Sequence, residues 1–407
     1  MCRQKNIDSL EKKKKEKRKN QQVEKMKNGK KKLRFQICRL KATMTTVKNP
    51  LTPFLKKLVI NPPTLTPGDL ATALRLIFQD AASDIQTGAF LSALRLRGLD
   101  QEPDYIAAAV NTVLEFAKTI PPEKVDSKGY IDIVGTGGDG QNTFNVSTSS
   151  AIVAAGMGLP VCKHGGKAST STSGSGDLLK SLGVDLSKVD ETTTPEIVSQ
   201  SKFCFLFAPS FHPGMGLVAH IRSQLGIPTI FNILGPLINP IPIQSRILGV
   251  YSEKLGESYA LAASILAKQS DVHVKTMVVF GEVVLDEISP IGTTKTWTID
   301  KEGTITRGSI SPADFGLPEH ELATVKSGTP QENAEVLMHI LRQDEEKYVV
   351  KEEGNHPLVD YILMNSAALA VVAGEARTWT EGVVLAKESI QSGKALQALE
   401  DLKKAIN

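Results

Sequence analysis

Two polar, glycine-rich segments, at residues 135–140 and 163–171, have the composition of loops that bind phosphate groups. Each directly follows a short apolar run, 130–134 for the first and 159–162 for the second, which predicts a strand that ends at a loop. Glycine lets backbone amides approach an anion closely, and successive amides form a concave nest for phosphate oxygens. The second segment adds lysines and hydroxyls, so the pair favours a ligand that carries more than one phosphate.

The first segment also matches the G-x-G-x-x-G pattern of dinucleotide-binding proteins, which is the main alternative. That interpretation requires a helix at the last glycine and an acidic residue about 20 residues further on. Residues 141–145 intervene before any predicted helix, and residues 159–165 hold no carboxylate. Asp139 would in addition repel a bare pyrophosphate. We therefore favour a phosphate loop over a nicotinamide dinucleotide site or a purely structural turn.

Residues 145–150 predict the polar start of a helix whose apolar body begins at Ala151. Free amides and the positive end of the helix dipole favour an anion at such a start. Simple capping by Ser or Thr is the alternative, but capping needs one hydroxyl and this segment offers four. Residues 169–177 could be a flexible Gly/Ser linker by composition, but a predicted strand and an apolar helix flank them. Both observations favour phosphate contact.

Asp286 and Glu287 are adjacent carboxylates at the end of the apolar stretch 278–285. Such a pair is often only a solvated turn. Mg²⁺, however, binds through one or two carboxylates together with substrate phosphates, so a magnesium site beside the phosphate loops is the functional alternative. The sequence contains no pattern typical of a Ser-His-Asp triad, a zinc-hydrolase HExxH motif or a Walker loop.

The elements that would position these residues change in type along the chain. Residues 51–120 predict a small helical domain. One helix begins after a capping Thr66, a second runs near 87–96, and a third carries an apolar stripe over 106–120 that a proline pair ends.

From Tyr130 onward, short apolar runs alternate with helical stretches. These runs are 130–134, 159–162, 203–208, 228–232, 247–251 and 274–280. Strands separated by helices predict the α/β fold class, with a mainly parallel sheet and helices on both sides. Ligands in such folds bind beyond the carboxyl ends of the strands, where both glycine-rich segments lie. A further helix over 216–226 carries Arg222 beside its apolar stripe, and the turn-rich stretch 231–240 could cross between domains.

The length of 407 residues corresponds to two or three domains. We expect a disordered basic extension at 1–43 and a helical domain at 44–124, on which 215–242 can pack. The α/β domain then comprises 128–214 and 243–407.

The charge of the chain is concentrated in residues 1–43. They carry 13 Lys and 4 Arg against 4 acidic residues, a net charge of +13, so the rest of a chain whose total is +4 has −9. A segment this charged cannot bury a core. We favour a solvated extension, or translation that starts at Met44, over a nucleic-acid or nuclear-import patch and over a mitochondrial transit peptide.

Cysteine usage and hydropathy indicate the compartment. The four cysteines are scattered, without the spacing of a zinc site or a disulfide framework, so we expect a reducing, cytoplasmic location. No apolar run approaches the roughly 18 residues that span a membrane, and no apolar segment near the start is typical of a secretory signal. We therefore expect no membrane partner.

Six segments in fixed order carry a resemblance to a known family. They are 135–139 (GTGGD), 145–148 (NVST), 163–165 (KHG), 173–175 (SGS), 232–237 (NILGPL) and 285–287 (LDE). Together they resemble the anthranilate phosphoribosyltransferases of tryptophan biosynthesis, from about Leu51 to the C-terminus. Single pieces are shared with the related pyrimidine nucleoside phosphorylases.

The resemblance implies a helical domain packed on an α/β domain and a pentosyl-transferring enzyme that is usually a homodimer. It implies phosphoribosyl pyrophosphate (PRPP) and anthranilate as substrates and Mg²⁺ as cofactor. The residues implied to contact PRPP are Gly135, Gly138, Asp139, Thr143, Asn145, Val146, Ser147, Thr148, Lys163, His164, Gly165, Gly166, Lys167, Ala168, Ser169, Thr170, Ser171 and Ser175. Those implied to contact anthranilate are Gly135, His164, Gly166 and Arg222, and those implied to hold magnesium are Ser147, Asp286 and Glu287.

One position departs from the family pattern, which usually has Asn after the Lys-His-Gly motif. Here the residue is Gly166, so the anthranilate assignment depends more on Arg222 and His164. We assign no general base, because an aryl amine is already nucleophilic, and we expect Lys163 and His164 to orient the substrate and stabilise charge. Two alternatives remain, a pyrimidine nucleoside phosphorylase and a non-catalytic nucleic-acid binder. The intact loops and the carboxylate pair make nucleic acid the less favoured partner.

Overall fold

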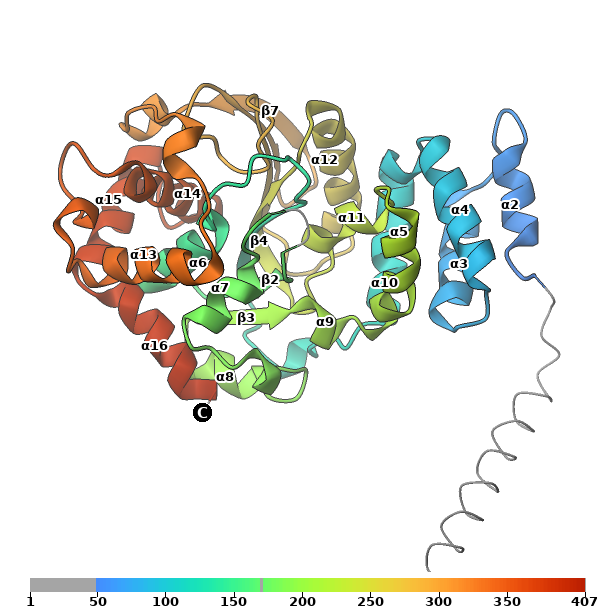
Figure 1. The fold of residues 1–407 in the computed structure, drawn as a ribbon, viewed down its shortest axis with the longest axis horizontal. Coiled ribbons are helices and arrows are strands. Elements are labelled where there is room, and N and C mark those ends of the chain that lie inside the picture. Colours follow the sequence, from blue (N-terminus) through green and yellow to red (C-terminus); the bar gives the residue numbers. More distant parts are fainter. Residues whose placement is uncertain (1–48, 169–170, 407) are drawn as a thin grey trace, which may run out of the picture. The chain divides into compact units, whose positions relative to one another are not determined.

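The computed structural model describes residues 49–168 and 171–406, and Leu51–Asn407 forms one compact unit (Figure 1). The basic extension expected at 1–43 lies outside the described residues. The chain combines a small helical part with a larger α/β part, as the sequence predicts. Among the described residues, no helix is both long enough and apolar enough to cross a bilayer. The exact domain boundaries stay a prediction.

Four helices make up the N-terminal helical part. They are α2 (Thr52–Val59), α3 (Pro67–Phe78), α4 (Asp84–Leu96) and α5 (Pro103–Glu115). The start of α3 is a capping box, because the amide of Asp69 donates to Thr66 Oγ1 over 3.1 Å and the amide of Thr66 donates back to the Asp69 carboxylate over 2.9 Å. The helix start predicted at Thr66 is therefore confirmed.

The third helix ends earlier than its apolar stripe predicts. α5 stops at Glu115, so the positions over 116–120 that continue the stripe are not helical. Beyond it the amide of Lys118 donates to the Phe211 carbonyl over 2.8 Å, and that of Ile120 donates to the Pro240 carbonyl over 2.9 Å. Backbone bonds to distant segments replace helical ones here, and the buried Ile120 joins the core of the α/β part instead.

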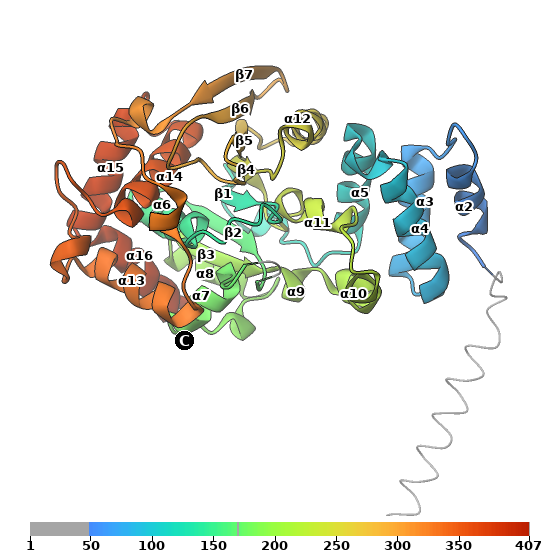
Figure 2. The ribbon, with the colours of Figure 1, turned by 45° about the horizontal axis from the view of Figure 1, so that its top comes forward.

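Seven strands form one sheet in the order β3-β2-β1-β4-β5-β6-β7 (Figure 2). Their bounds are β1 (Tyr130–Gly135), β2 (Val161–Gly165), β3 (Phe203–Phe207), β4 (Ile243–Gly249), β5 (Lys275–Gly281), β6 (Thr294–Ile299) and β7 (Ile305–Ile310). The first five are parallel, whereas β6 and β7 extend the sheet as an antiparallel hairpin. The mainly parallel sheet predicted from the sequence is thus confirmed.

The prediction of a strand at 228–232 is wrong. The segment forms a turn followed by α11 (Phe231–Leu234). The cause is local, because the Asn232 side chain accepts from the amide of Thr229 over 2.9 Å, and the amide of Asn232 donates to the Thr229 carbonyl over 2.9 Å. An Asx-type side chain that bonds the backbone in this way competes with a strand.

Strand side chains alternate between two cores, one on each face of the sheet. On β5, Met277 and Val279 enter one core, and Val278 and Phe280 enter the other. On the first face α6 (Val146–Gly156), α14 (Pro357–Ala373) and α16 (Lys394–Ile406) lie against the strands, and α13 (Pro330–Arg342) and α15 (Trp379–Gln391) pack on these helices. α7 (Ser175–Ser181) contacts α13, and α8 (Thr194–Gln200) contacts β3 at the edge of the sheet. The second face is covered by α12 (Glu253–Ala267), and Figure 2 shows α12 and α14 on opposite sides of the strands.

The second core continues without a break into the helical part. It includes apolar side chains of α3, α4 and α5 together with those of α12. Gln101 donates to the Tyr251 hydroxyl over 3.2 Å, and Asn111 donates to Gln269 over 3.1 Å across the same contact. The segment α9 (Ala208–Phe211) and α10 (Pro213–Leu225) leads away from β3, and α10 contacts α3 and α4.

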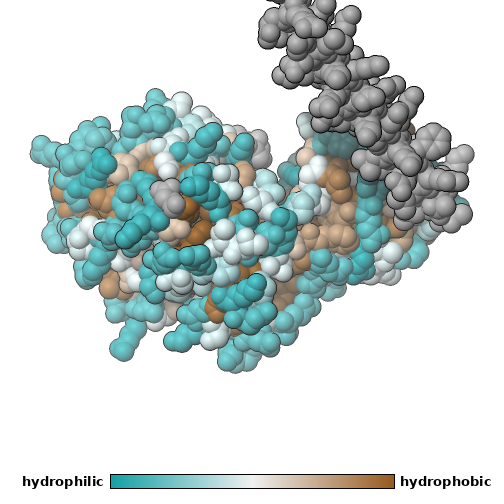
Figure 3. Space-filling model, turned by 90° about the horizontal axis from the view of Figure 1, so that it is seen from below, coloured by the Kyte–Doolittle hydropathy of each residue, from teal (hydrophilic) through white to brown (hydrophobic). Residues whose placement is uncertain are grey.

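Several large apolar side chains on the helical part remain exposed. Ile85 and Leu96 on α4 are 85% and 84% exposed, and Val59 and Ile60 at the end of α2 are 64% and 47% exposed. Figure 3 shows brown, apolar surface over this part, at the right of the view. Ile85 and Leu96 lie at opposite ends of α4, and single exposed apolar residues are ordinary on a protein surface.

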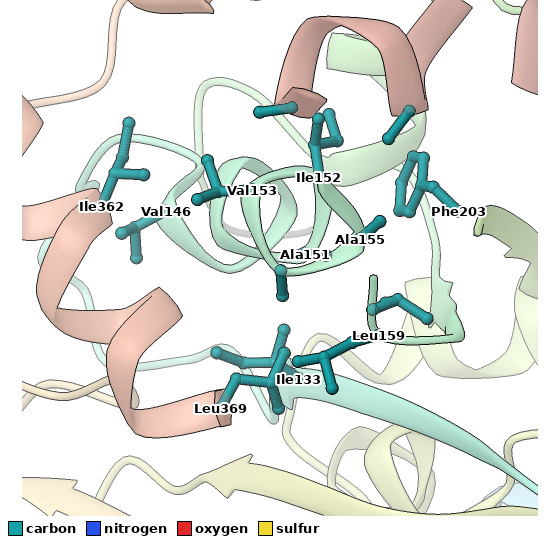
Figure 4. Packing of buried hydrophobic residues seen from close by; sticks show 14 of the residues in the cluster. Ile133, Val146, Ala151, Ile152, Val153, Ala155, Leu159, Phe203, Ile362 and Leu369 are labelled. Carbon is teal, nitrogen blue, oxygen red and sulfur yellow. The ribbon is translucent and has the colours of Figure 1, made fainter. Parts of the chain in front are cut away.

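Helix α6 lies in the middle of the first core and is buried on almost all sides (Figure 4). Ile133 of β1 and Leu369 of α14 lie on one side of it, and Ile362 packs beside Val146 near its start. At its C-terminal end, a Cβ added to Gly156 would lie 2.5 Å from the backbone nitrogen of Ala395 and 2.6 Å from its Cα. The close approach of α6 and α16 therefore requires glycine at this position.

We expect Gly156→Ala to lower the thermal unfolding midpoint by several degrees. Overpacking against a backbone costs about 1–3 kcal/mol, which exceeds the gain of up to about 1 kcal/mol from replacing glycine within a helix. Gly216→Ala is the matched control, because no described atom lies within 4 Å of the added Cβ on α10. Its midpoint should stay or rise, and a Gly156→Ala midpoint equal to that of the natural protein would contradict the packing argument.

Candidate active site

The first glycine-rich loop begins where β1 ends and turns back over the carboxyl end of the sheet. Gly137, Gly138 and Gly140 have φ of 69°, 85° and 75°, in the left-handed region that favours glycine. Successive residues of this kind point backbone amides into a concave surface that suits an anion. The loop leads into α6, whose first intrahelical bond runs from the amide of Ser149 to the Asn145 carbonyl over 3.0 Å. The amide of Val146 donates to the Phe144 carbonyl over 2.6 Å, whereas those of Ser147 and Thr148 find no acceptor among the described residues and can bind a ligand.

The second loop is closed at its base by one carboxylate. Asp177, in the first turn of α7, accepts from the amide of Ala168 over 2.9 Å and from that of Gly174 over 3.2 Å. A Cβ on Gly174 would overlap the backbone of Ala168. The two ends of the loop are thus held against each other, which a flexible linker would not require. Ser169 and Thr170, two of the residues implied to contact PRPP, lie outside the described residues.

Asparagine side chains join the two loops. The amide of Thr172 donates to Asn142 Oδ1 over 2.8 Å, and Asn145 Nδ2 donates to the Ser173 carbonyl over 2.7 Å. Asn333 at the start of α13 in turn donates to Asn145 Oδ1 over 2.9 Å. Since the loops hold each other through these bonds, they form one binding surface.

The Lys-His-Gly motif lies inside a strand, which corrects the loop expected to begin at residue 163. β2 runs to Gly165, so Lys163 and His164 are buried strand residues that are 1% and 2% exposed. Lys163 Nζ donates to the Ile133 carbonyl, and burial lowers the pKa of this lysine. Buried Asp132 lies nearby, and its charge favours the protonated form of Lys163. The positive charge predicted for Lys163 is therefore held at a fixed place in the sheet below the two loops.

His164 is a neutral hydrogen-bonding group. Its Nδ1 lies 3.1 Å from the Gly235 carbonyl, and because a carbonyl only accepts, Nδ1 carries the proton. Burial, with a smaller contribution from His212, lowers the pKa of His164 to about 3. His212 packs edge-on at 5.1 Å between ring centroids. His212 belongs to no motif that the sequence shows, and only its position directly before α10 distinguishes it.

Asp286 lies across the ends of two neighbouring strands. Its Oδ2 accepts from the amide of Gly137 over 2.6 Å. A Cβ on Gly135 would lie 2.7 Å from Asp286 Cγ, and one on Gly249 would overlap the Asp286 carbonyl. β1 and β4 therefore both end in glycine because the loop that carries this carboxylate lies directly on them.

Glu287 is held from two sides. Thr143 of the first loop donates to Glu287 Oε2 over 3.3 Å, and the hydroxyl of Tyr361 on α14 donates to the same oxygen. Burial raises the pKa of Glu287 to about 8, with a further contribution from Asp286. Burial and the facing Asp139 carboxylate also raise the pKa of Asp286. Negative charge at this point is thus unfavourable until a cation arrives.

The carboxylate pair fits Mg²⁺. Within residues 49–168 and 171–406, no three His, Cys, Asp or Glu side chains converge into a ready-made metal cage. Mg²⁺ takes oxygen ligands, keeps several waters, and binds through one or two carboxylates together with substrate phosphates. Buried Asp286 and half-buried Glu287, beside amide-lined loops, meet that requirement, and Ser147 in the first turn of α6 lies in the cavity between the loops.

The two loops enclose a cavity of about 280 Å³. Residues of the implied PRPP and magnesium sets that line it are Gly135, Asp139, Thr143, Asn145, Ser147, Lys163, His164, Gly165, Gly166, Lys167, Ala168, Ser171, Ser175 and Asp286. Gly138, Val146, Thr148 and Glu287 do not line it, and Val146 and Thr148 are fully buried. Lining residues absent from the sequence-based set are Val134, Thr136, Gly137, Asn142, Ser173, Gly174, Ala208, Gly235 and Pro236. Six of them, Thr136, Gly137, Ser173, Gly174, Gly235 and Pro236, lie inside the sequence motifs quoted above, and that position was the signal that could have found them.

Arg222 lies outside the residues that line this cavity. It is carried by α10, and its guanidinium carbon lies 5.7 Å from the centroid of the Phe231 ring. Its Nε is buried and has no hydrogen-bond partner among the described residues. Burial lowers the pKa of Arg222, and no carboxylate within residues 49–168 and 171–406 offsets the lost solvation. A half-buried cation in such surroundings is suited to binding a carboxylate ligand.

Two family models match this chain. The glycosyl transferase family a/b domain matches residues 127–396, and the glycosyl transferase family helical bundle domain matches residues 52–117. These ranges coincide with the α/β and helical parts described above.

Relatives and solved structures agree with this match. The anthranilate phosphoribosyltransferase of Saccharomyces cerevisiae is 46% identical over 371 residues, 85% of this chain and 96% of the relative. That of Schizosaccharomyces pombe is 48% identical over 329 residues, 81% of this chain and 89% of the relative. The structure of the S. cerevisiae enzyme in complex with PRPP and Mg has a TM-score of 0.80 at 43% identity, covering 88% of this chain and 97% of that one. The resemblance seen in the sequence is confirmed, and the chain belongs to the glycosyl transferase family and, within it, to the anthranilate phosphoribosyltransferases.

Proposed function

We propose that this chain transfers the 5-phosphoribosyl group of PRPP to the amine of anthranilate, releasing pyrophosphate, as a step of tryptophan biosynthesis. The observation that carries the proposal is the cavity itself, in which two amide-lined loops meet beside the Asp286–Glu287 pair. The solved S. cerevisiae relative binds PRPP and Mg, and a second structure of it, with a TM-score of 0.78, holds 4-fluoroanthranilate.

The chain's own residues would bind and align the reactants. The bond between C1 of the ribose and the pyrophosphate oxygen breaks with its electron pair leaving on the oxygen, while the amine nitrogen bonds to C1 and then releases one proton. Backbone amides of both loops, the free amides at the start of α6, and Lys167 would bind phosphate oxygens. Lys163 adds a fixed positive charge in the floor. Such preorganised groups stabilise the charge that builds up on the leaving group.

Asp286, Glu287 and Ser147 would hold the magnesium ion. When bound, the ion neutralises negative charge on the pyrophosphate and relieves the repulsion between the two carboxylates. The raised pKa values of Asp286 and Glu287 support this assignment, since two neighbouring carboxylates whose charge is unfavourable gain most from a cation.

Arg222 would bind the carboxylate of anthranilate, because a guanidinium can hold a carboxylate through two parallel hydrogen bonds. Gly135 and His164 would lie near the same substrate, His164 as a neutral ring. Gly166, which replaces the usual Asn, can offer only its backbone. No described atom lies within 4 Å of a Cβ added there, so an asparagine would have room.

We further propose that the protein is a homodimer located in the cytoplasm. In the homodimer, the exposed apolar side chains of α2 and α4 would be covered by a second copy.

The cysteines support the cytoplasmic location. Cys162 and Cys204 are unpaired although they lie opposite each other on β2 and β3, in keeping with a reducing compartment.

The activity should depend on both PRPP and a divalent cation. Anthranilate fluorescence should fall when the protein, PRPP and Mg²⁺ are mixed, and removal of the metal by EDTA should reduce the rate at least about tenfold, because the carboxylates then repel the pyrophosphate. Readdition of Mg²⁺ should restore the rate. Thymidine and inorganic phosphate are the control substrates, and phosphorolysis without anthranilate turnover would contradict the proposal.

Arg222→Ala should raise KM for anthranilate about tenfold to a hundredfold and leave KM for PRPP within about twofold. A charge-assisted hydrogen bond contributes about 1.5–3 kcal/mol, and each 1.4 kcal/mol changes binding tenfold. Steady-state kinetics with each substrate varied in turn measure both constants.

The matched control is Arg75→Ala, which removes an arginine of α3 whose partner Glu115 lies on the surface. Surface ion pairs contribute little, so both KM values should remain unchanged. Equal increases of the two constants in Arg222→Ala would contradict a role in binding anthranilate alone.

A further inference from the structure

Tyr361 is a buried residue that neither substrate needs to touch, yet its hydroxyl reaches a carboxylate of the site. The side chain is 0% exposed on α14, and its hydroxyl donates to Glu287 Oε2. It does not line the cavity between the two loops. Thr143, which donates to the same Glu287 oxygen, also contacts the Tyr361 hydroxyl, so the polar contacts of Tyr361 converge on Glu287.

The helix that carries Tyr361 is attached to the same loop one turn further on. Asn365 Nδ2 donates to the Ile288 carbonyl over 3.3 Å. The loop that carries Asp286 and Glu287 is thus bonded to α14 at two successive turns. Such bonds fix the position of the loop backbone as well as that of the Glu287 carboxylate.

The start of α14 is itself anchored by buried polar groups. Asp360 is 3% exposed, and its two carboxylate oxygens accept from His320 and Asn355, each over 2.8 Å. The amide of His320 donates to the Pro290 carbonyl over 2.8 Å. The residue before Tyr361 is therefore tied back to the far side of the same loop, so Tyr361 cannot move independently of Glu287.

We propose that Tyr361 is a positioning residue for Glu287 and thereby sets the affinity of the site for magnesium. The inference rests on the proposed function. Tyr361 and Thr143 both donate to Oε2, and no described residue donates to Oε1, which is left for the metal. A carboxylate held through one oxygen presents the other in a fixed direction, and loss of such a partner typically costs 10-fold to 100-fold in metal affinity.

The test is Tyr361→Phe, which removes one hydroxyl and keeps the ring. PRPP binding is measured by calorimetry without anthranilate, so that no turnover occurs, over a series of Mg²⁺ concentrations. We expect the Mg²⁺ concentration for half-maximal PRPP binding to rise about tenfold, with full binding regained at saturating Mg²⁺ and KM for anthranilate unchanged. A rise of threefold or more supports the proposal, and a smaller rise overturns it.

Tyr259→Phe is the matched control. Tyr259 is also 0% exposed, and its hydroxyl donates to the Ile233 carbonyl over 2.6 Å, so the variant loses a comparable buried bond elsewhere. Its Mg²⁺ requirement should equal that of the natural protein, whereas equal shifts in both variants would overturn the positioning role. The thermal unfolding midpoint of each variant is measured first, and binding is then compared at a temperature at least 15 °C below the lower of the two midpoints. A natural protein that binds no PRPP at any Mg²⁺ concentration would contradict the proposed function instead.

Discussion

The backbone and carboxylate of Asp286 press against the ends of β1 and β4, and the rest of the site is built around this contact. A Cβ at either Gly135 or Gly249 would collide with Asp286. Because both strands end in glycine, the carboxylate can lie directly over the sheet and accept the amide of Gly137. The first loop is thereby fixed relative to the carboxylate pair before any ligand binds.

The same arrangement concentrates opposite charges at different depths. Lys163 is fixed in the strand below the loops, whereas Asp139, Asp286 and Glu287 lie at the carboxyl end of the sheet. A polyanionic substrate would then bind with a cation between its phosphates and these carboxylates. In the proposed function the acidic residues would make the site selective for a metal-bound ligand, and the fixed amides and lysine would attract the phosphates.

Most residues of the site could be predicted from the sequence, because they lie in motifs rich in glycine, hydroxyl and carboxylate groups. Residues within the motifs, such as Asp139, Asn145 and Lys167, line the cavity. They follow the ends of parallel strands, which lie at the same edge of the sheet. Gly235 and Pro236 line the cavity too; the sequence marks them as part of the motif at 232–237, but only tertiary contact shows that they belong to the site. Tyr361 could not be predicted for the same reason. A tyrosine in an apolar helix has the sequence pattern of an ordinary core residue, and only the structure shows that its hydroxyl donates to Glu287.

The elements that were predicted wrongly from the sequence are also explained by bonds to the backbone that the sequence pattern does not show. The run 228–232 is apolar enough for a strand, but Asn232 bonds its own backbone and forms a turn. α5 ends before its apolar stripe does because the chain after Glu115 finds carbonyl partners at Phe211 and Pro240. The alternation in 294–299, with the Gly303 turn before 305–310, is typical of a hairpin and could have been recognised.

The antiparallel direction of β6 has a consequence for how the carboxylates can vary. A helical crossover after β5 would carry the chain to the opposite end of the sheet, but β6 returns from the same end at which β5 stops. Residues 282–293 therefore leave and re-enter the sheet within one short arch. Insertions or deletions in this arch would displace Asp286 and Glu287 directly, so its length should be far less free to change than that of the distal β6–β7 turn.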